Sequence, residues 1–124
     1  LMAALSADIR YCLASEPDLG KAVALVNESF LRGGWDDRFA TLVVAVLDPI
    51  RHAVEICNAG HLPVFLRDSG GVRHVAGDLG GLPLGMDAGH VFRTCTVELP
   101  PEGAFVVCTD GVTEAMDHAA TCYG

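Results

Sequence analysis

The sequence predicts an α+β fold in which helices are segregated from mostly antiparallel sheets. Apolar residues repeat at intervals of three or four over residues 1–34, which is the spacing of amphipathic helices. From residue 39 onward the apolar runs are short, rich in β-branched residues and separated by turns of hairpin length. Helices followed by consecutive strands, without crossover helices between them, are typical of this class.

The length and composition predict one folded domain. A chain of 124 residues fits a single core, and 51% hydrophobic against 19% charged residues argues against disorder. Sixteen acidic residues against eight Lys and Arg give a formal net charge of -8. This charge argues against nucleic acid or an anionic membrane as the partner.

The cysteines and the absence of long apolar runs predict a cytoplasmic protein. The five cysteines are odd in number and contain no C-x-x-C pair, which favours small core residues in a reducing compartment over a zinc site. No apolar run approaches the roughly 18 residues of a membrane span, and no signal-peptide pattern is present. The start within a helical pattern at Leu1 and the end at Gly124 predict a piece of a longer protein.

Two helices are expected first. Leu1–Ser15 carries an apolar stripe, with Asp8 and Arg10 on the other side. Pro17 is expected at the first position of a second helix, which Gly33 and Gly34 end.

The strands are expected to begin with a buried strand at Phe39–Leu47, in which Thr41 packs with its hydroxyl bonded to the backbone. Ala53–Cys57 and His61–Leu66 are expected to pair as a hairpin across the turn 58–60, so that three strands form a meander. The remaining expected strands are Val72–Ala76, His90–Leu99 and Ala104–Cys108, the last covered on both faces. The loop Gly77–Gly85 is interpreted either as a mobile flap or partner-docking loop, or as a wide turn between sheets.

An acidic residue follows the last expected strand, in Thr109-Asp110-Gly111. A carboxylate at a sheet edge can hold a hard cation or act in catalysis, and Gly111 permits a backbone angle that other residues resist. The alternative is that Asp110 caps the helix that follows. Glu114, in the first turn of that helix, is either a further metal ligand or a solvated or capping acid.

Four motifs in order resemble a known family. They are Asn58-Ala59-Gly60-His61 followed by Pro63, then Gly81-Leu82-Pro83-Leu84-Gly85, then Leu99-Pro100-Pro101, then Thr109-Asp110-Gly111-Val112-Thr113-Glu114-Ala115. The series resembles the metal-dependent serine/threonine protein phosphatases, the PPM type. Within them it is most similar to the bacterial branch typified by the stage II sporulation phosphatase E and by regulators of the general stress response. The motifs span nearly the whole chain.

The resemblance implies an α-β-β-α sandwich of mostly antiparallel sheets with flanking helices, truncated at both ends, with residues 1–124 as the central part of a single domain. It implies a binuclear Mn²⁺ or Mg²⁺ site in the full-length protein, with Asp110 as catalytic residue and metal ligand. Asn58, Gly60, His61 and Gly111 are implied to line the pocket or to lie beside the metal centre. Residues outside 1–124 are implied to carry the other principal metal-binding aspartates.

The resemblance also implies a function. Two cations acidify a shared water and neutralise the phosphate of phosphoserine or phosphothreonine during hydrolysis. The implied substrate is a phosphorylated antagonist of an anti-sigma factor, and an upstream sensor or receiver domain is expected. Because one carboxylate cannot hold two hard cations, residues 1–124 alone are expected to be inactive. The rival hypothesis is a non-catalytic phosphatase-like module for binding or signal relay.

Two of the implied pocket residues have structural alternatives. His61 either orients a metal-bound water or metal ligand, or is a turn histidine that bonds backbone and packs beside Pro63. Asn58 is interpreted as structural, because asparagine tolerates the left-handed conformation of tight turns. The other histidines share no spacing that indicates a metal site.

Overall fold

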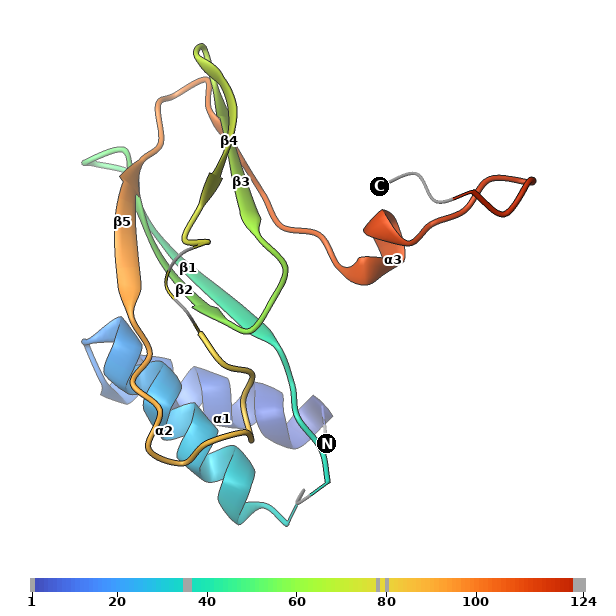
Figure 1. Ribbon diagram of the computed structural model, residues 1–124. Helices are drawn as coiled ribbons and strands as arrows, with labels where there is room; N and C mark the ends of the chain where they lie inside the picture. Colours follow the sequence, from blue (N-terminus) through green and yellow to red (C-terminus); the bar gives the residue numbers. More distant parts are fainter. Residues whose placement is uncertain (1, 35–36, 78, 80, 122–124) are drawn as a thin grey trace.

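The computed structural model describes residues 2–34, 37–77, 79 and 81–121 (Figure 1). Two helices precede six strands and a short third helix. Their bounds are α1 Met2–Ser15, α2 Leu19–Arg32, β1 Leu42–Asp48, β2 Ala53–Ala59, β3 Val64–Asp68, β4 Gly71–Val75, β5 Thr94–Glu98, β6 Ala104–Val106 and α3 Asp110–Thr113. The predicted α+β class is confirmed.

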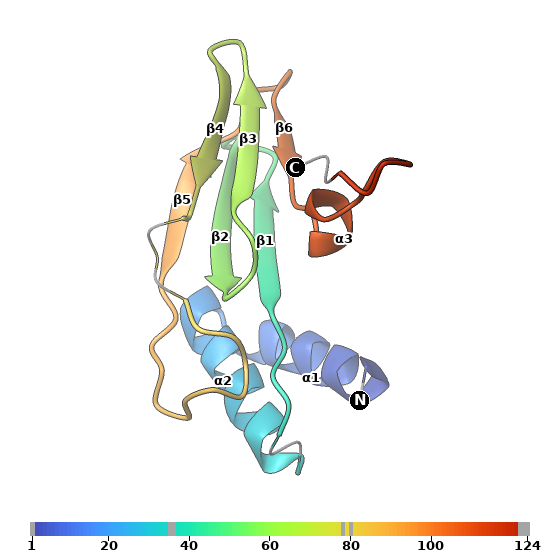
Figure 2. The same cartoon turned by 45° about the vertical axis from the view of Figure 1, so that its right-hand side comes forward.

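The strands form two three-stranded antiparallel sheets, in the orders β1-β2-β5 and β4-β3-β6. The predicted hairpin between Ala53–Cys57 and His61–Leu66 is wrong, because β2 and β3 belong to different sheets. Residues 60–63 carry the chain from one sheet to the other (Figure 2). β3 and β4 form a hairpin, with Asp68 opposite Gly71.

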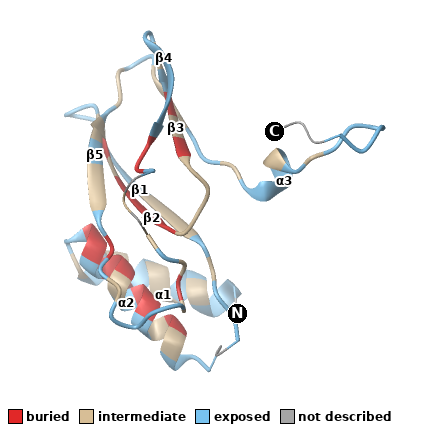
Figure 3. Ribbon diagram, viewed as in Figure 1, coloured by how far each residue is buried: buried red, intermediate tan, exposed pale blue. Residues whose placement is uncertain are grey.

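Two clusters of buried side chains hold the layers together (Figure 3). The first joins α1 and α2 to the outer face of the β1-β2-β5 sheet, and it includes Val26, Phe30 and Cys57. The second fills the space between the sheets, and it includes Ile56 and Leu66, both fully buried. The described residues therefore supply two stacked sheets and the helical layer over one of them.

The start of α2 differs from the prediction. Asp18 is the N-cap, its carboxylate accepts a hydrogen bond from the Lys21 backbone N–H at 2.9 Å, and the helix begins at Leu19. Pro17 therefore lies before the cap and not at the first helical position. A capping carboxylate satisfies one of the free backbone N–H groups at a helix start, so it sets the boundary more strongly than the proline does.

Three predicted strands are shorter or more exposed than expected. β1 begins at Leu42 and is an edge strand, with Leu47 62% exposed, so it is not a buried strand. β6 is also an edge strand and ends at Val106, which is 47% exposed, so the prediction of cover on both faces is wrong for the described chain. β5 begins at Thr94 rather than at His90. A short run without charged residues is therefore not sufficient to predict that a strand is buried.

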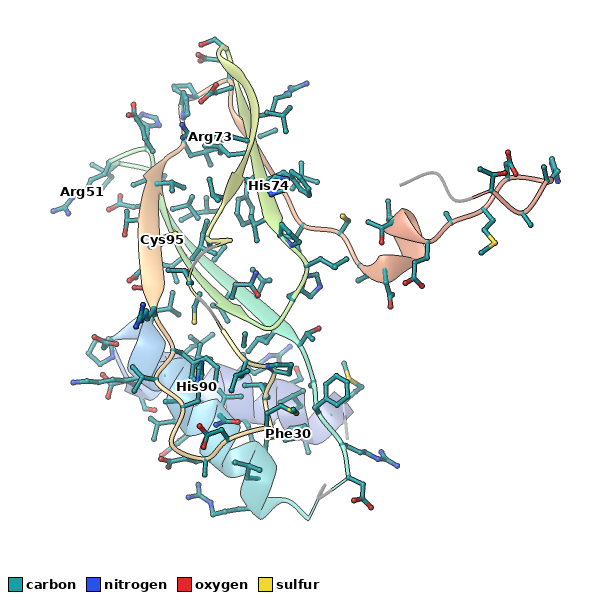
Figure 4. The ribbon with its side chains drawn as sticks, in the orientation of Figure 1. Phe30, Arg51, Arg73, His74, His90 and Cys95 are labelled. Carbon is teal, nitrogen blue, oxygen red and sulfur yellow. The ribbon has the colours of Figure 1, made fainter. Side chains whose placement is uncertain are left out.

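The connection between β4 and β5 packs on the helices in its second half. Leu84 is fully buried and exchanges backbone hydrogen bonds with Ala40 at 2.7 and 3.1 Å. Figure 4 shows Phe30 of α2 and His90 of this connection at the level of the helices. For residues 81–85 the structure favours the wide turn between sheets. Residues 78 and 80 of the predicted Gly77–Gly85 loop lie outside the described residues.

Candidate functional site

A cavity of about 260 Å³ lies where the connection between the sheets meets the start of α3. It is lined by Thr41, Gly60, His61, Leu62, Thr109 and Asp110. The structure thus brings Asp110 next to the turn that carries His61, although 48 positions separate the two residues in the sequence. The Asn58–His61 motif and the Thr109–Ala115 motif thus contribute to one cavity.

The turn from Asn58 to Leu62 is closed by the Asn58 side chain. Its Oδ1 accepts the His61 backbone N–H at 2.8 Å, and its Nδ2 donates to the carbonyl oxygens of His61 and Leu62, both at 3.3 Å. Asn58 is buried, 8% exposed, and lies in β2 with extended backbone. Asn58 therefore organises the turn through its amide, and the predicted left-handed conformation is wrong.

Gly60 adopts the left-handed conformation instead, with φ +71°. A Cβ built there would lie 2.5 Å from atoms of Pro83, so the glycine is required both by backbone angle and by close approach. Gly81 is required in the same way, since a Cβ would collide with the carbonyl oxygen of Asn58. The Gly81–Gly85 motif thus packs directly against the Asn58–His61 motif.

The His61 ring contacts the backbone of its own turn. Its Nδ1 lies 3.3 Å from the carbonyl oxygen of Leu62. Because a carbonyl oxygen only accepts hydrogen bonds, Nδ1 is the donor in this contact. This geometry matches the turn-histidine alternative, because His61 does bond backbone. It also leaves Nε2 without a hydrogen-bond partner among the described residues.

Asp110 is the first residue of α3, and the N-cap is Thr109, which makes no capping hydrogen bond with its side chain. The capping alternative for Asp110 is therefore wrong. Asp110 is exposed, and its carboxylate has no hydrogen-bond partner among the described residues. A solvated carboxylate that faces a cavity is able to bind a ligand without first breaking an internal contact.

Gly111 and Glu114 lie close by but do not line this cavity. Gly111 has the helical backbone of α3, so the expectation of an unusual angle is wrong. Glu114 is the exposed C-cap residue of α3. The structure therefore brings Asp110, His61 and Gly60 together in the cavity lining. Gly111 and Glu114 are not part of that lining.

The donor set fits part of a hard-cation site. Mn²⁺ and Mg²⁺ prefer oxygen ligands and need about six of them, and Asp110 contributes one carboxylate. Within residues 2–34, 37–77, 79 and 81–121, no three His, Cys, Asp or Glu side chains lie close enough together to hold a metal ion. Asp110 thus suits one ligand of a cation site that the described residues do not complete.

Thr41 is a cavity residue that the sequence did not reveal. It was expected to pack inside a strand, but it precedes β1, is exposed and lines the cavity. A single hydroxyl residue between Ala40 and Leu42 has no spacing that would mark it as functional.

The prediction that the cysteines are core residues is confirmed for Cys12 and Cys57, which are buried. Cys95 and Cys108 are half-buried, and none of these four described cysteines is in a disulfide. Cys122 lies outside the described residues. Over the part of the chain that is described, no helix is long and apolar enough to cross a membrane.

Comparison with known proteins gives three kinds of match. The family model for stage II sporulation protein E (SpoIIE) matches residues 1–124. Protein IcfG of Synechocystis sp. is 33% identical over 104 residues, which are 83% of this chain and 16% of that protein. The phosphoserine phosphatase RsbP of Bacillus subtilis is 29% identical over 85 residues, which are 68% of this chain and 20% of that protein.

A solved structure shares the fold. The RsbU and RsbW domains of Rv1364c from Mycobacterium tuberculosis superpose with a TM-score of 0.78 and 26% identity. The match covers 93% of this chain and 32% of that one. The chain thus spans a fifth or less of the two curated relatives and a third of this structural neighbour.

Proposed function

Because this chain belongs to the stage II sporulation protein E (SpoIIE) family, we propose that it is the central part of a metal-dependent phosphoprotein phosphatase domain. The observation that supports the proposal most is the cavity shared by Asp110 and the His61 turn. The name of the relative RsbP, a phosphoserine phosphatase, supports hydrolysis of phosphoserine or phosphothreonine.

In this proposal the residues of the cavity have separate tasks. Asp110 supplies one carboxylate to a site for two Mn²⁺ or Mg²⁺ ions. When bound, such ions acidify water and neutralise phosphate oxygens. His61 bonds the Leu62 carbonyl oxygen through Nδ1, which leaves Nε2 as the ring nitrogen that can contact a ligand. Asn58 and Gly60 hold the His61 backbone in place through the hydrogen bonds and close contacts described above. Glu114, beside the cavity, is a second candidate ligand.

The finer biological role rests on the resemblance of the motifs to the stress-response branch. We infer that the substrate is a phosphorylated protein, an antagonist of an anti-sigma factor, and that a sensor or receiver domain precedes the phosphatase in the complete protein. The charge of -8 disfavours nucleic acid as a partner and favours solubility. The ligands missing from the described residues are assigned to chain outside residues 1–124.

The test is a phosphatase assay of the complete protein with Mn²⁺ and a phosphoserine peptide. Asp110→Asn keeps the size of the side chain and removes its charge, and we expect it to lower kcat/KM by about a hundredfold or more, since a lost charge-assisted ligand costs several kcal/mol. Asp68→Asn is the matched control, because Asp68 ends β3 at the distal hairpin and only accepts a hydrogen bond from the Gly70 N–H. Equal activity of wild type and Asp110→Asn removes the assignment.

One observation favours the rival function, a non-catalytic module for binding or signal relay. The described residues contribute only one carboxylate to the cavity. A complete protein that neither hydrolyses the phosphopeptide nor binds Mn²⁺ would establish the rival. Binding of Mn²⁺ without hydrolysis would also favour it.

A further inference from the structure

Thr41 occupies a position that is fixed from both sides. Its neighbour Ala40 exchanges two backbone hydrogen bonds with Leu84, at 2.7 and 3.1 Å. On the other side, Leu42 pairs with Ala59 in the β1-β2 ladder. Thr41 is therefore held beside the Asn58–His61 turn by paired residues, and its place does not depend on its own side chain.

The alternation of β1 indicates which side Thr41 faces. Leu42 and Val44 pack against the cluster on the helices, whereas Val43 packs between the sheets. Successive side chains of an extended segment point to opposite faces, so Thr41 lies on the same side as Val43. This is the side on which the chain crosses from β2 to β3, and Thr41 accordingly lines the cavity with His61 and Asp110.

The hydroxyl of Thr41 is available for a ligand. The residue is exposed, and its side chain makes no hydrogen bond to the residues that the structure describes. By contrast, the Thr94 hydroxyl donates to the Glu55 carboxylate at 3.1 Å, and the Thr113 hydroxyl donates to the Asp110 carbonyl oxygen at 3.4 Å. A hydroxyl whose backbone neighbours are both held, and which has no partner among the described residues, is suited to donate to an incoming oxygen.

We propose that Thr41 positions the ligand of this cavity by donating a hydrogen bond from Oγ1 to a negatively polarised oxygen, either of a phosphoryl group or of a water bound to a cation. The inference rests on the proposed function and names a further residue of the same site. A hydrogen bond to a charged acceptor contributes more than a neutral one, so its loss is measurable.

The experiment compares Thr41→Val, which keeps the shape and removes the hydroxyl, with Thr41→Ser, which keeps the hydroxyl. Thr96→Val is the control, because Thr96 is an exposed threonine of β5 that does not line this cavity. In the complete protein, we expect Thr41→Val to lower kcat/KM for a phosphoserine peptide about tenfold to a hundredfold. Thr41→Ser stays within about threefold of wild type, and all three variants keep the wild-type thermal midpoint.

Two titrations without turnover identify the oxygen. If Thr41 contacts a cation-bound water, Thr41→Val weakens Mn²⁺ binding in calorimetry. If it contacts a phosphoryl oxygen, Mn²⁺ binding is unchanged and inorganic phosphate binds the Mn²⁺-loaded protein less tightly. Either result supports the inference. Wild-type behaviour of Thr41→Val in the assay and both titrations overturns it, and so does an equal loss in Thr41→Ser.

The two proposals fail in different ways. If Asp110→Asn abolishes activity while Thr41→Val behaves as wild type, only the role of Thr41 falls. If Asp110→Asn is as active as wild type, the proposed cation site itself falls. A wild-type complete protein that binds neither Mn²⁺ nor phosphate overturns both.

Discussion

At the scale of single residues, the turn between the sheets is determined by Asn58 and Gly60. Asn58 satisfies three backbone groups of the turn with one buried amide, and Gly60 takes the one left-handed angle next to Pro83. The sequence motif correctly marked both residues as special. It assigned the left-handed angle to Asn58, because asparagine and glycine are the two residue types that tolerate it and the sequence does not show which one adopts it.

Gly60→Ala is predicted to destabilise the fold and displace the His61 turn. A left-handed alanine and the contact with Pro83 together cost about 1–3 kcal/mol of unfolding free energy. Urea unfolding measures this loss. Gly77→Ala is the control, since a Cβ there meets no atom within 4 Å and its φ is not positive, and it should change stability by less than about 0.5 kcal/mol. Equal stabilities of the two variants contradict the account.

The stability of the fold is predicted to fall at alkaline pH because of Cys57. Burial raises the pKa of this thiol from 9.0 to about 11, and the charge of Glu55 acts in the same direction. Below pH 9 the thiol is protonated in both states. Between pH 9 and 11 the unfolded chain loses its proton first, so stability decreases as pH rises.

The expected loss from this thiol between pH 8 and pH 10.5 is roughly 2 kcal/mol. Urea unfolding at both pH values measures it in the wild type. Cys57→Ala serves as reference, because it removes the titrating group while leaving every other ionisable side chain in place. A pH-dependent loss in the variant as large as in the wild type would show that Cys57 does not cause it.

At the scale of elements, the error over the hairpin has a clear physical cause. The connection from β2 to β3 has hairpin length, but β2 and β3 both carry buried side chains that belong between the sheets, such as Ile56 and Leu66. Stacking the strands buries these faces against each other, which pairing them side by side in one sheet does not. Strand positions were therefore predictable from local pattern, whereas sheet membership depends on which faces meet.

The helix α2 is joined to the connection between β4 and β5 by one buried side chain. Asn27 is 1% exposed, its Oδ1 accepts the Gly85 N–H at 2.8 Å, and its Nδ2 donates to the Asp87 carbonyl at 2.8 Å. Since Gly81 in the same connection packs on Asn58, this link also helps to hold the Asn58–His61 turn of the candidate site in place. Nothing in the helical pattern of α2 distinguished Asn27, because its partners lie about 60 positions away.

Asn27→Leu is predicted to lower the unfolding free energy by roughly 2–4 kcal/mol, because two part-buried hydrogen bonds between this side chain and the backbone are lost. Hydrogen exchange should report faster exchange at the Gly85 amide in the same variant. Glu28→Gln is the control on the same helix: its ion pair with Arg32 is 3.9 Å long and exposed, and its loss costs less than about 0.5 kcal/mol. An unchanged Gly85 amide contradicts the assigned link.

At the scale of the whole molecule, the segregation of helices and strands along the chain was sufficient to predict the α+β class. The prediction of burial was less successful, because β1 and β6 are sheet edges and expose apolar side chains such as Leu47 and Val106. The position of Asp110 beside His61 followed from the motifs, and the roles of both residues stay predictions. Thr41 was missed because its place in the cavity depends on which distant residues lie opposite it, and a single sequence does not show this.

Residues 1–124 expressed alone are predicted to show no phosphatase activity with Mn²⁺, whereas the complete protein is active. Asp110 is the one carboxylate that the described residues offer to the cavity, and it cannot hold two hard cations, each of which needs several oxygen ligands. Parallel assays with the same phosphoserine peptide measure the difference, and circular dichroism checks that the shorter chain is folded. Comparable activity of the folded shorter chain would show that the described residues suffice.

The most direct test of the central claim is calorimetric titration of the complete protein with Mn²⁺. The account predicts that wild type and the distal control Asp68→Asn bind Mn²⁺ alike, and that Asp110→Asn binds at least about tenfold more weakly, because a charged oxygen ligand is lost. Equal affinities of wild type and Asp110→Asn would contradict the claim that Asp110, beside the His61 turn, is a ligand of a cation site.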